Sequence, residues 1–538
     1  MLKWKTLSHN GPYIPEKQIL DISVFVNGKK HQLTGLAAEM AYAWAAKIKT
    51  DYVKDKTFQK NFWHDFKPQL PKELQSSKWP DDWDFEEAYN EIQKQREDKK
   101  NRSKEEKERE KLEKEARKEK YGYAYYDGKK VEIMNYVVEP PGLFMGRGKH
   151  PLRGRWKPRI NYEDIILNLS EKAKIPPGKW KGVVHNHDAI WIAYWRDKLT
   201  NNYKYVLPSP KSFIRQQNDI NKFEKAMKLI EKMPEMMDFI ETGMESSNSL
   251  IREIATVCSL IAHLGIRVGD EKDEDEAETY GATTLLRKHV EITRDYVFLS
   301  FLGKDSILYR NRVKLPKLTV RNLKELIKDK KPDEQVFQNT TSKEVNLFLS
   351  KVLPGATAKV FRTAIATAVM KNFLEQYKDK NISELEKIKI FKEANILVAQ
   401  KLNHRKTPTE SAKNSIKKKQ LKIKELKHQL KDIQKEYNDE IAKLKQQIKN
   451  FKNKSRARQR IEKTKERYEK KLNRFSDRIK KLELQAEIQK KSLDLNLGTS
   501  LSAYVNPRVT FGWAKEVELE LSKIYTKSNI EKFEWAKE

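Results

Sequence analysis

The sequence has a single cysteine, Cys258, among its 538 residues. A disulfide framework and a cysteine-rich zinc site both need several cysteines, so both are excluded. No apolar run approaches the ~20 residues that a helix needs to cross a bilayer, and the first residues, MLKWKTLSHNGPY, lack the apolar core of a signal peptide. The phosphate-loop pattern G-x-x-x-x-G-K-S/T is also missing, which leaves an ATP-driven mechanism without support. We therefore expect an intracellular protein.

Acidic residues are scarce relative to basic ones, with 77 Asp and Glu against 110 Lys and Arg, which gives a formal net charge of +33. This excess makes a polyanion the leading partner, with a membrane surface as the weaker alternative. Hydrophobic residues make up 38% of the chain and charged residues 35%, so part of the chain must be solvated. The remainder can bury a core, because 11 Trp and 20 Phe are present. The length predicts three or four domains.

The first part of the chain is predicted to mix helices and strands. Residues 1–90 combine short apolar clusters with several tryptophans and predict a compact α+β piece. Residues 91–120 are almost entirely polar and charged, which is typical of an exposed helix or linker. Strands are expected from residue 121 onward, before a loop rich in Gly, Pro and Arg. The stretch KWKGVVHNHDAIWIAYW, residues 179–195, predicts a strand, a tight turn and a second strand.

The second part is predicted to be mainly helical. Apolar residues at three- and four-residue spacing predict helices over residues 212–267. The stretch VFLSFLGKDSILYRNRV, residues 297–313, predicts a β-hairpin that turns at Gly303-Lys304-Asp305. Further helices are expected as far as about His404.

Residues 410–490 carry apolar side chains near heptad spacing in two stretches, separated by a break at residues 450–460. This pattern predicts an antiparallel coiled-coil hairpin whose exposed faces are mostly Lys, Glu and Gln. The heptad positions are Ile416, Ile423, Leu426, Leu430, Ile433, Tyr437, Leu444 and Phe451, followed by Ile461, Tyr468, Leu472, Phe475, Ile479 and Leu482.

Two motifs suggest metal chemistry, but each has a simpler interpretation. HNHD, residues 185–188, falls at the tip of the predicted hairpin, where two His and one Asp would need further ligands that we do not find. The acidic run at residues 270–278 lacks the glycine and the ligand spacing of a calcium loop. We interpret the first as a plain turn and the second as a solvated acidic loop, and we expect no metal.

The stretch GLFMGRGKHPLRGRWKPR, residues 142–159, concentrates basic side chains in a loop rich in Gly and Pro. Glycine permits close approach of the backbone, and arginine can contact phosphates. Because the whole chain is basic, a nucleic-acid contact is favoured over a plain basic surface. The basic residues are Arg147, Lys149, Arg153, Arg155, Lys157 and Arg159.

Five polar residues stand in unusual settings. Arg267 lies between two glycines at a predicted helix end, and Lys304 lies on a hairpin tip. Arg362 falls within an apolar helix, where an unpaired charge is costly. His404 ends a helix just before the coiled coil, and Tyr504 sits among small and polar residues in LGTSLSAYVNPR. A core carboxylate or an ordinary hydrogen bond explains each basic residue alone, whereas the setting of Tyr504 predicts a phenol held in place but accessible.

Six segments, taken in order, resemble one known family: EPPGLFMGRGKHP, IRVGDEKDEDE, FLGKDSI, AKVFRT, LNHRKTP and LGTSLSAYVNPR. The chain resembles eukaryotic nuclear-type DNA topoisomerase IB, the type I enzyme that camptothecin targets. The resemblance runs from Lys3 to the last residue, and the charged hairpin between the last two segments adds to its specificity. It implies relaxation of supercoiled duplex DNA by transient cleavage of one strand, rotation and religation, without ATP, metal or another cofactor.

The resemblance also implies the site residues. Tyr504 aligns with the nucleophile, which forms a 3′-phosphotyrosyl link, and Arg267, Lys304, Arg362 and His404 align with the other four catalytic residues.

DNA contacts are expected from four further residues. Arg147, His150 and Lys204 fall in segments where the family contacts DNA, and Lys157 belongs to the basic loop.

The implied fold is an α+β multidomain clamp around DNA. Residues 1–210 form a mixed α/β cap with two subdomains, and residues 211–405 form a mainly helical catalytic domain of tyrosine-recombinase-like type. Residues 406–490 form an antiparallel coiled-coil linker, and residues 491–538 form the C-terminal domain that carries the tyrosine. We expect a monomer, because one clamp closes around DNA alone.

The chain departs from the family in two places. Ala503 stands where the family usually has Asn, beside the camptothecin pocket. The chain also begins at the family core, without the long basic N-terminal tail that carries nuclear-import signals. We expect a nuclear protein, with a virion, a viral factory or the cytoplasm as the alternative if the source is a large DNA virus.

Two rival interpretations remain open. A tyrosine recombinase shares the Arg, Lys, Arg, His and Tyr chemistry, but it needs subunits that pair two DNA sites. A non-catalytic, coiled-coil DNA-binding protein would fit the composition, but it does not account for five separately placed catalytic residue types.

Overall fold

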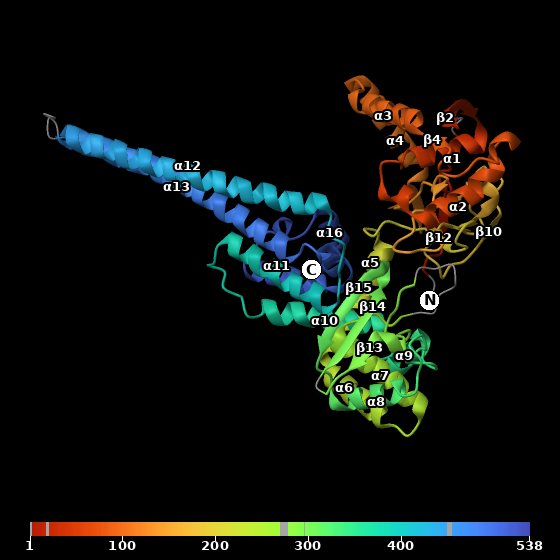
Figure 1. Cartoon of the computed structure of the whole chain (residues 1–538). Coiled ribbons are helices and arrows are strands. Elements are labelled where there is room, and N and C mark those ends of the chain that lie inside the picture. The colour runs from red at the N-terminus through yellow and green to blue at the C-terminus, as the bar shows by residue number, and fades with distance from the viewer. Residues whose placement is uncertain (1–2, 18–20, 270–277, 295, 449–453, 538) are drawn as a thin grey trace. The chain divides into compact units, whose positions relative to one another are not determined.

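Contacts along the chain divide it into two units of mixed α/β structure. The structure is a computed structural model that describes residues 3–17, 21–269, 278–294, 296–448 and 454–537. The first unit holds residues 1–221 together with 270–280 and 301–308, and the second unit holds residues 222–269, 281–300 and 309–538. Figure 1 labels many of the helices and strands of both. The mixed α/β class that the sequence predicts is confirmed.

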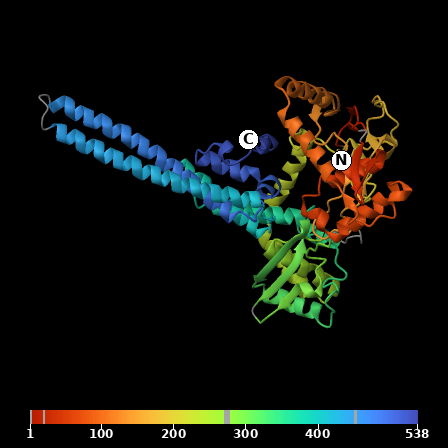
Figure 2. The ribbon, with the colours of Figure 1, turned by 45° about the horizontal axis from the view of Figure 1, so that its top comes forward.

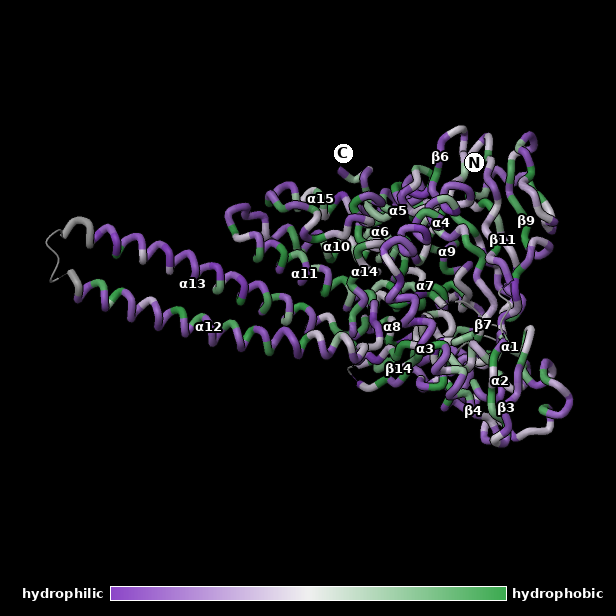
Figure 3. Tube along the Cα trace, turned by 90° about the horizontal axis from the view of Figure 1, so that it is seen from above, coloured by the Kyte–Doolittle hydropathy of each residue, from purple (hydrophilic) through white to green (hydrophobic). Residues whose placement is uncertain are grey.

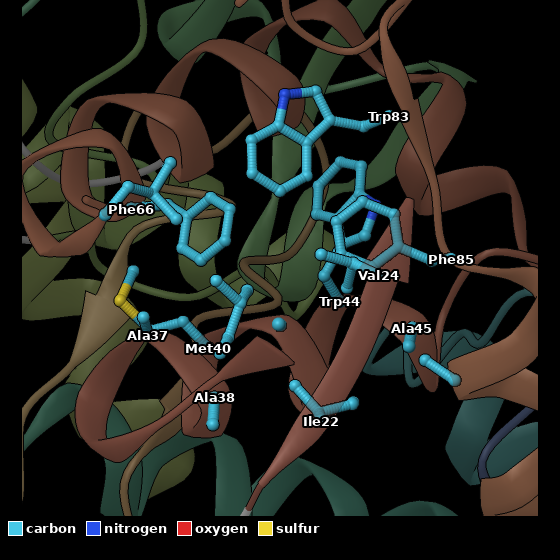
Figure 4. Packing of buried hydrophobic residues seen from close by; sticks show 14 of the residues in the cluster. Ile22, Val24, Ala37, Ala38, Met40, Trp44, Ala45, Phe66, Trp83 and Phe85 are labelled. Atoms are coloured by element: carbon cyan, nitrogen blue, oxygen red, sulfur yellow. The ribbon is translucent and has the colours of Figure 1, made fainter. Parts of the chain in front are cut away.

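An aromatic core organises the beginning of the first unit (Figure 4). Trp44 stacks on Phe62 with ring centroids 4.5 Å apart, and it meets the edge of Trp79 at 4.7 Å. This buried cluster confirms the predicted compact α+β piece. Burial of several large rings stabilises a fold of this size. The surrounding elements are strands β2 (Ile22–Val26), β3 (Lys29–Leu33) and β4 (Trp83–Asp84), in the order β3-β2-β4, with helices α1 (Gly35–Ala45) and α2 (Lys56–Phe66).

Two highly charged helices connect this core to the next sheet. The predicted exposed helix at 91–120 is observed as α3 (Glu86–Asn101) and α4 (Lys104–Tyr121), which lacks buried residues. Ser103 separates them as the N-cap of α4, and its side chain accepts a hydrogen bond from the backbone of Glu106. The predicted strands follow as the hairpin of β5 (Tyr123–Tyr126) and β6 (Lys129–Glu132), which β1 (Leu7–His9) extends, and as the pair β7 (Gly142–Leu143) and β8 (Trp156–Lys157).

The hairpin predicted over residues 179–195 is wrong in its pairing. Strand β9 (Ile165–Asn168) lies between the two segments, so that β10 (Gly182–Val184) pairs with it in parallel and β11 (Ala193–Arg196) pairs with it antiparallel. The buried Asn168 on β9 joins the segments on either side of it. Its side-chain amide donates to the carbonyls of Asn186 and Trp191, both at 3.1 Å, and its oxygen accepts from the backbone of Asn186 at 2.8 Å. Strand β12 (Tyr203–Val206) completes the sheet.

The second unit is mainly helical. The helices predicted over 212–267 are confirmed, and so is the hairpin at 297–313, whose turn is a short 3-10 segment from Lys304 to Ser306. The elements are α5 (Phe213–Glu231, which begins in the first unit), α6 (Met233–Glu245), α7 (Ser249–Leu264), β13 (Val290–Ile292), β14 (Val297–Gly303), β15 (Ile307–Val313), α8 (Lys317–Ile327), α9 (Ser342–Ser350), α10 (Ala358–Leu374) and α11 (Glu384–Lys401). The connected ends of β14 and β15, at residues 301–308, belong to the first unit.

Two long helices, α12 (Glu410–Ile448) and α13 (Lys454–Lys491), run side by side in the second unit (Figures 1 and 2). Their residues are mostly hydrophilic, with hydrophobic ones at intervals along each helix (Figure 3). The predicted break at 450–460 is too long, because α13 already begins at Lys454, and the predicted heptad residue Phe451 lies outside the described residues. Buried positions among the described side chains of the pair are Ile416, Leu426, Ile433 and Ile441 on α12, and Ile461, Thr464, Tyr468, Ile479, Leu484, Ala486 and Ile488 on α13.

The chain ends in short helical segments of the same unit. These are α14 (Leu497–Thr499), a π-helical turn over Ser500–Tyr504, α15 (Pro507–Glu516) and α16 (Lys527–Lys532). In the described part of the chain, we find no helix with the length and apolar content to cross a membrane.

We predict that Phe62→Ala lowers the free energy of unfolding by about 3–5 kcal/mol, because the side chain is fully buried in the aromatic core. Urea denaturation followed by tryptophan fluorescence measures the change. Leu112→Ala is the matched control, since this apolar side chain is 58% exposed on α4 of the same unit. Equal losses for the two variants would contradict the prediction.

Candidate active site

Two helix ends meet at a glycine. Helix α7 ends at Gly265, which adopts a left-handed conformation with φ +63°. A Cβ atom at this position would lie 2.4 Å from the backbone oxygen of Lys401, the last residue of α11. Glycine is therefore needed here both for the backbone conformation and for the close approach of the two helix ends.

Arg362, on α10, joins these two helix ends to a tyrosine. Its Nε donates to the Gly265 carbonyl at 2.8 Å, one terminal nitrogen donates to the Leu402 carbonyl at 2.9 Å, and the other donates to the Tyr504 hydroxyl at 2.9 Å. Carbonyls at the C-terminal ends of helices carry partial negative charge, so they partly compensate the buried guanidinium. Burial lowers the pKa of Arg362 to about 10, which leaves it charged at neutral pH.

His404 lies just beyond the end of α11. Asn403 takes the left-handed conformation with φ +51°, and the backbone N–H of His404 donates to the Ala399 carbonyl, as in a helix-ending Schellman motif. Its ring Nδ1 lies 2.8 Å from the Ser500 hydroxyl, whereas Nε2 is buried and lacks a hydrogen-bond partner among the described residues. Burial first, and then the charges of Arg362 and Arg267, lower the pKa of His404 to about 3. The imidazole is therefore neutral at neutral pH.

Tyr504 ends the π-helical turn and is only 8% exposed. The sequence prediction is half right, because the phenol is held in place but is buried. Its ring centroid lies 4.8 Å from that of His404, and the Arg362 guanidinium lies 4.8 Å from the same ring. Burial, the largest single influence, raises the pKa of Tyr504. The positive charges of Arg362, Arg267 and Lys359 outweigh it, so the pKa of Tyr504 lies below its ordinary value.

The turn that carries Tyr504 is fixed through its backbone. The Thr367 hydroxyl donates to the Tyr504 carbonyl at 3.3 Å and accepts from the Asn506 N–H at 3.1 Å. Two ammonium groups hold the preceding carbonyls, with Lys222 3.1 Å from the oxygen of Ala503 and Lys532 2.6 Å from that of Ser502. We did not single out these hydrogen-bonding residues from the sequence, because such long-range contacts leave no local pattern.

The structure brings together four of the five predicted catalytic residues. Arg267 follows the end of α7 in the second unit, and its charge acts on both Tyr504 and His404. Lys304 is exposed on the turn between β14 and β15, and this turn belongs to the first unit.

The predicted DNA-contacting residues, all in the first unit, differ in their surroundings. Arg147 and Lys204 are exposed. The half-buried His150 packs edge-on against Phe144 at 4.8 Å, and its Nδ1 accepts from the Leu152 N–H. Lys157, in contrast, is largely buried between carboxylates, 2.6 Å from Glu139 and 3.1 Å from Asp197. Its charge is thus compensated within the protein, which gives its predicted DNA contact less support.

The HNHD segment forms a turn, and both of its histidines form hydrogen bonds with other parts of the protein. His185 lies 2.7 Å from the Leu169 carbonyl, and His187 contacts the Trp4 carbonyl and the Glu171 carboxylate. Most of the acidic run, residues 270–277, lies outside the described residues. Cys258 is buried in α7.

Taken together, these groups are suited to nucleophilic attack on a phosphate diester. A phenol whose pKa is lowered by arginines ionises more readily to the attacking phenolate, and the same arginines can neutralise charge on phosphate oxygens. These side chains of the second unit thus form a candidate site for transfer of a phosphoryl group through a tyrosine.

Comparison with known proteins agrees with this class. Three family descriptions match successive parts of the chain: the DNA-binding fragment of eukaryotic DNA topoisomerase I at residues 2–208, its catalytic core at 211–437, and the C-terminal topoisomerase domain at 476–538. The chain is 34% identical to human DNA topoisomerase 1, covering 99% of this chain and 71% of the human protein. The chain belongs to the eukaryotic DNA topoisomerase I family.

Two other relatives extend well beyond the matched region. DNA topoisomerase 1 alpha of Arabidopsis thaliana is 35% identical, and DNA topoisomerase 1 of Drosophila melanogaster is 31% identical, each over 99% of this chain. The chain spans 58% of the first and 54% of the second.

We predict that His404 stays neutral between pH 4.5 and 8 in the folded protein, since its pKa lies at about 3. Histidine NMR spectra recorded across this range, with the His404 signal assigned from a His404→Gln variant, measure the titration. His187 is the internal control, because hydrogen bonds to Trp4 and Glu171 raise its pKa above the ordinary value. A His404 midpoint near pH 6 would contradict the prediction.

The lowered pKa of His404 also makes the free energy of unfolding depend on pH. The unfolded histidine has a pKa of ~6.5, so the unfolded chain binds this proton first as the pH falls. His404 therefore lowers the free energy of unfolding between about pH 6.5 and 3, and has no such effect above that window.

Proposed function

We propose that the chain is a type IB DNA topoisomerase that relaxes supercoiled duplex DNA. The hydrogen bond from the buried Arg362 to the Tyr504 hydroxyl, beside the neutral His404, carries this proposal. Membership of the family supports it, and so does the net charge of +33, which suits a DNA partner.

In the cleavage step, the Tyr504 hydroxyl loses its proton to water, and its oxygen attacks the phosphorus of one DNA strand. The bond from phosphorus to the 5′-oxygen breaks, and a 3′-phosphotyrosyl link forms with a free 5′-hydroxyl. Arg267 and Arg362 neutralise the charge on the non-bridging oxygens, and the His404 Nε2, which lacks a partner among the described residues, can donate to one of them. Because Tyr504 is buried, the phosphate has to reach the hydroxyl through an opening that DNA binding creates.

The leaving 5′-oxygen needs a proton, and we assign this role to Lys304. Its exposed ammonium group lies on a hairpin tip that can enter a groove of the duplex. After rotation of the downstream duplex, the 5′-hydroxyl attacks the phosphotyrosyl link and releases Tyr504. The phosphotyrosyl bond conserves the energy of the broken linkage, so religation requires no ATP. Two arginines and one lysine supply the positive charge, so no metal and no other cofactor take part.

The proposed architecture is a clamp. Residues 1–210 would form the cap, 211–405 a catalytic domain of tyrosine-recombinase-like type, 406–490 a coiled-coil linker and 491–538 the C-terminal domain. A single chain would enclose the duplex as a monomer. We place the protein in the nucleus on the basis of its eukaryotic relatives.

We predict that the wild type relaxes supercoiled plasmid in EDTA without ATP, whereas Tyr504→Phe does not, because the variant lacks the attacking oxygen. Gel electrophoresis of the plasmid, with trapping of the covalent adduct by detergent, measures both steps. The variant should still bind DNA, since the basic surfaces are unchanged.

Tyr437→Phe on α12 is the matched control and should relax plasmid like the wild type. Relaxation by Tyr504→Phe would place the nucleophile elsewhere. Binding without cleavage by the wild type would favour the architectural DNA-binding protein, and joining of two plasmids would favour the recombinase.

The base of the α12–α13 hairpin is fastened to the site. The Asn496 N–H donates to the His404 carbonyl at 2.6 Å, and the Lys406 N–H donates to the Asp494 carbonyl at 2.8 Å. Arg405 forms an ion pair with Asp494 beside these bonds. The segments that carry His404 and Tyr504 are therefore paired at this base.

We predict that replacing residues 410–490 by a short Gly/Ser loop preserves DNA cleavage but makes relaxation less processive and less dependent on salt. Loss of lysines that face the duplex reduces the number of released counterions. Relaxation rates across a series of salt concentrations measure the slope. A variant with Lys463, Lys470 and Lys480 changed to Gln keeps the α12–α13 hairpin but removes positive charge. It therefore separates the effect of the charge from the effect of the hairpin itself. Unchanged slopes in both variants would contradict a DNA contact by the arm.

A further inference from the structure

The two ring nitrogens of His404 have different partners. Nδ1 lies 2.8 Å from the Ser500 hydroxyl, and both side chains are buried, with His404 3% and Ser500 0% exposed. Nε2 lacks a hydrogen-bond partner among the described residues. A neutral imidazole carries one proton, so its position decides which nitrogen can donate.

Only one of the two tautomers can donate a hydrogen bond from Nε2 to a phosphate oxygen. If the proton is on Nδ1, it is donated to Ser500, and Nε2 presents a lone pair that repels phosphate oxygens. If the proton is on Nε2, the Ser500 hydroxyl donates to Nδ1, and Nε2 can donate to a phosphate oxygen.

We propose that Ser500 is a positioning residue, which donates its hydroxyl proton to Nδ1 of His404 and so keeps the proton of the ring on Nε2. The expected effect of Ser500 on DNA cleavage rests on the proposed function. It assigns no contact with DNA to Ser500 itself, which acts through the histidine.

A count of unsatisfied groups favours this tautomer. With the proton on Nε2, one buried donor, the Nε2–H itself, lacks a partner in the DNA-free protein. With the proton on Nδ1, both the Ser500 hydrogen and the Nε2 lone pair lack partners among the described residues, because the contact with His404 is the hydrogen bond that the Ser500 side chain makes. Each unsatisfied buried group costs free energy, so the arrangement with one such group is preferred.

The position of Ser500 in the chain adds a second reason. Ser500 begins the π-helical turn that Tyr504 ends, and widened turns of this kind occur often at functional sites. Thr367 and Lys222 hold the far end of the turn. The same short segment thus fixes both the attacking phenol and the tautomer of its neighbouring imidazole.

The first test is NMR spectroscopy of protein with ¹⁵N-labelled histidine, because the shifts of the ring nitrogens report which one is protonated. We expect the wild type to carry its His404 proton on Nε2, and Ser500→Ala to show a mixture or the Nδ1 form. Ser502→Ala is the matched control, since this serine lies in the same turn and its bond to Lys532 uses the backbone oxygen. If the His404 ring proton of the wild-type protein is on Nδ1, the inference is overturned. This result can be observed without any variant.

The second test is single-turnover cleavage of a DNA duplex. Ser500→Ala should cleave about tenfold more slowly than the wild type, less than the ~100-fold loss typical when a positioned donor itself is removed, because the His404 ring is still present. In a His404→Gln background, the same substitution should cause no further loss, because Ser500 acts through the histidine. Ser500→Cys, which keeps a weak donor of similar size, should recover part of the rate. Equal additive losses in both backgrounds would overturn the inference.

The two tests separate this inference from the proposed function. If the wild type does not cleave DNA, yet its tautomer shifts in Ser500→Ala, the proposed function fails and the role of Ser500 in fixing the tautomer stands. If cleavage occurs and depends on His404, but Ser500→Ala changes neither the spectrum nor the rate, the inference alone fails.

Discussion

The arrangement of the site depends on one buried guanidinium. Arg362 uses three N–H groups to connect the end of α7, the end of α11 and the Tyr504 hydroxyl. An uncompensated charge in the interior would cost several kcal/mol, so the two helix ends that receive it have to stay where they are. The glycine at the end of α7, with no side chain to separate the helices, makes that geometry attainable.

The charge of Arg362 also acts on the two titratable groups beside it, Tyr504 and His404. Burial first, and then the charges of Arg362 and Arg267, disfavour the imidazolium and lower the pKa of His404. At Tyr504 burial raises the pKa, but the positive charges outweigh it and favour the phenolate. Tyr504 ionises more readily to the attacking phenolate, and His404 remains a neutral donor. The site is thus electrostatically prepared for an anion before any anion binds, which avoids reorganisation when the phosphate arrives.

The elements with strong periodicity were predictable from the sequence, but tertiary pairing was less so. Helical spacing located α5 to α7 and the long α12 and α13, whereas the order of β9, β10 and β11 involves hydrogen bonds from Asn168 that span distant segments. The site residues came from their joint resemblance to a family, since Arg362 alone could equally have met a core carboxylate. Ser500 stood within a recognised motif, but its bond to His404 links residues 96 positions apart, and no local pattern encodes it.

The hairpin base gives the site a mechanical property. Helix α12 has 39 residues and is about 58 Å long at ~1.5 Å per residue. Helix α12 begins at Glu410, soon after His404 in the chain, and α13 ends at Lys491, before Ser500. A lever of this length converts a tilt of about 5° at the base into a displacement of about 5 Å at the tip. Conversely, a force of given size at the tip exerts its largest torque where the histidine and the tyrosine are anchored.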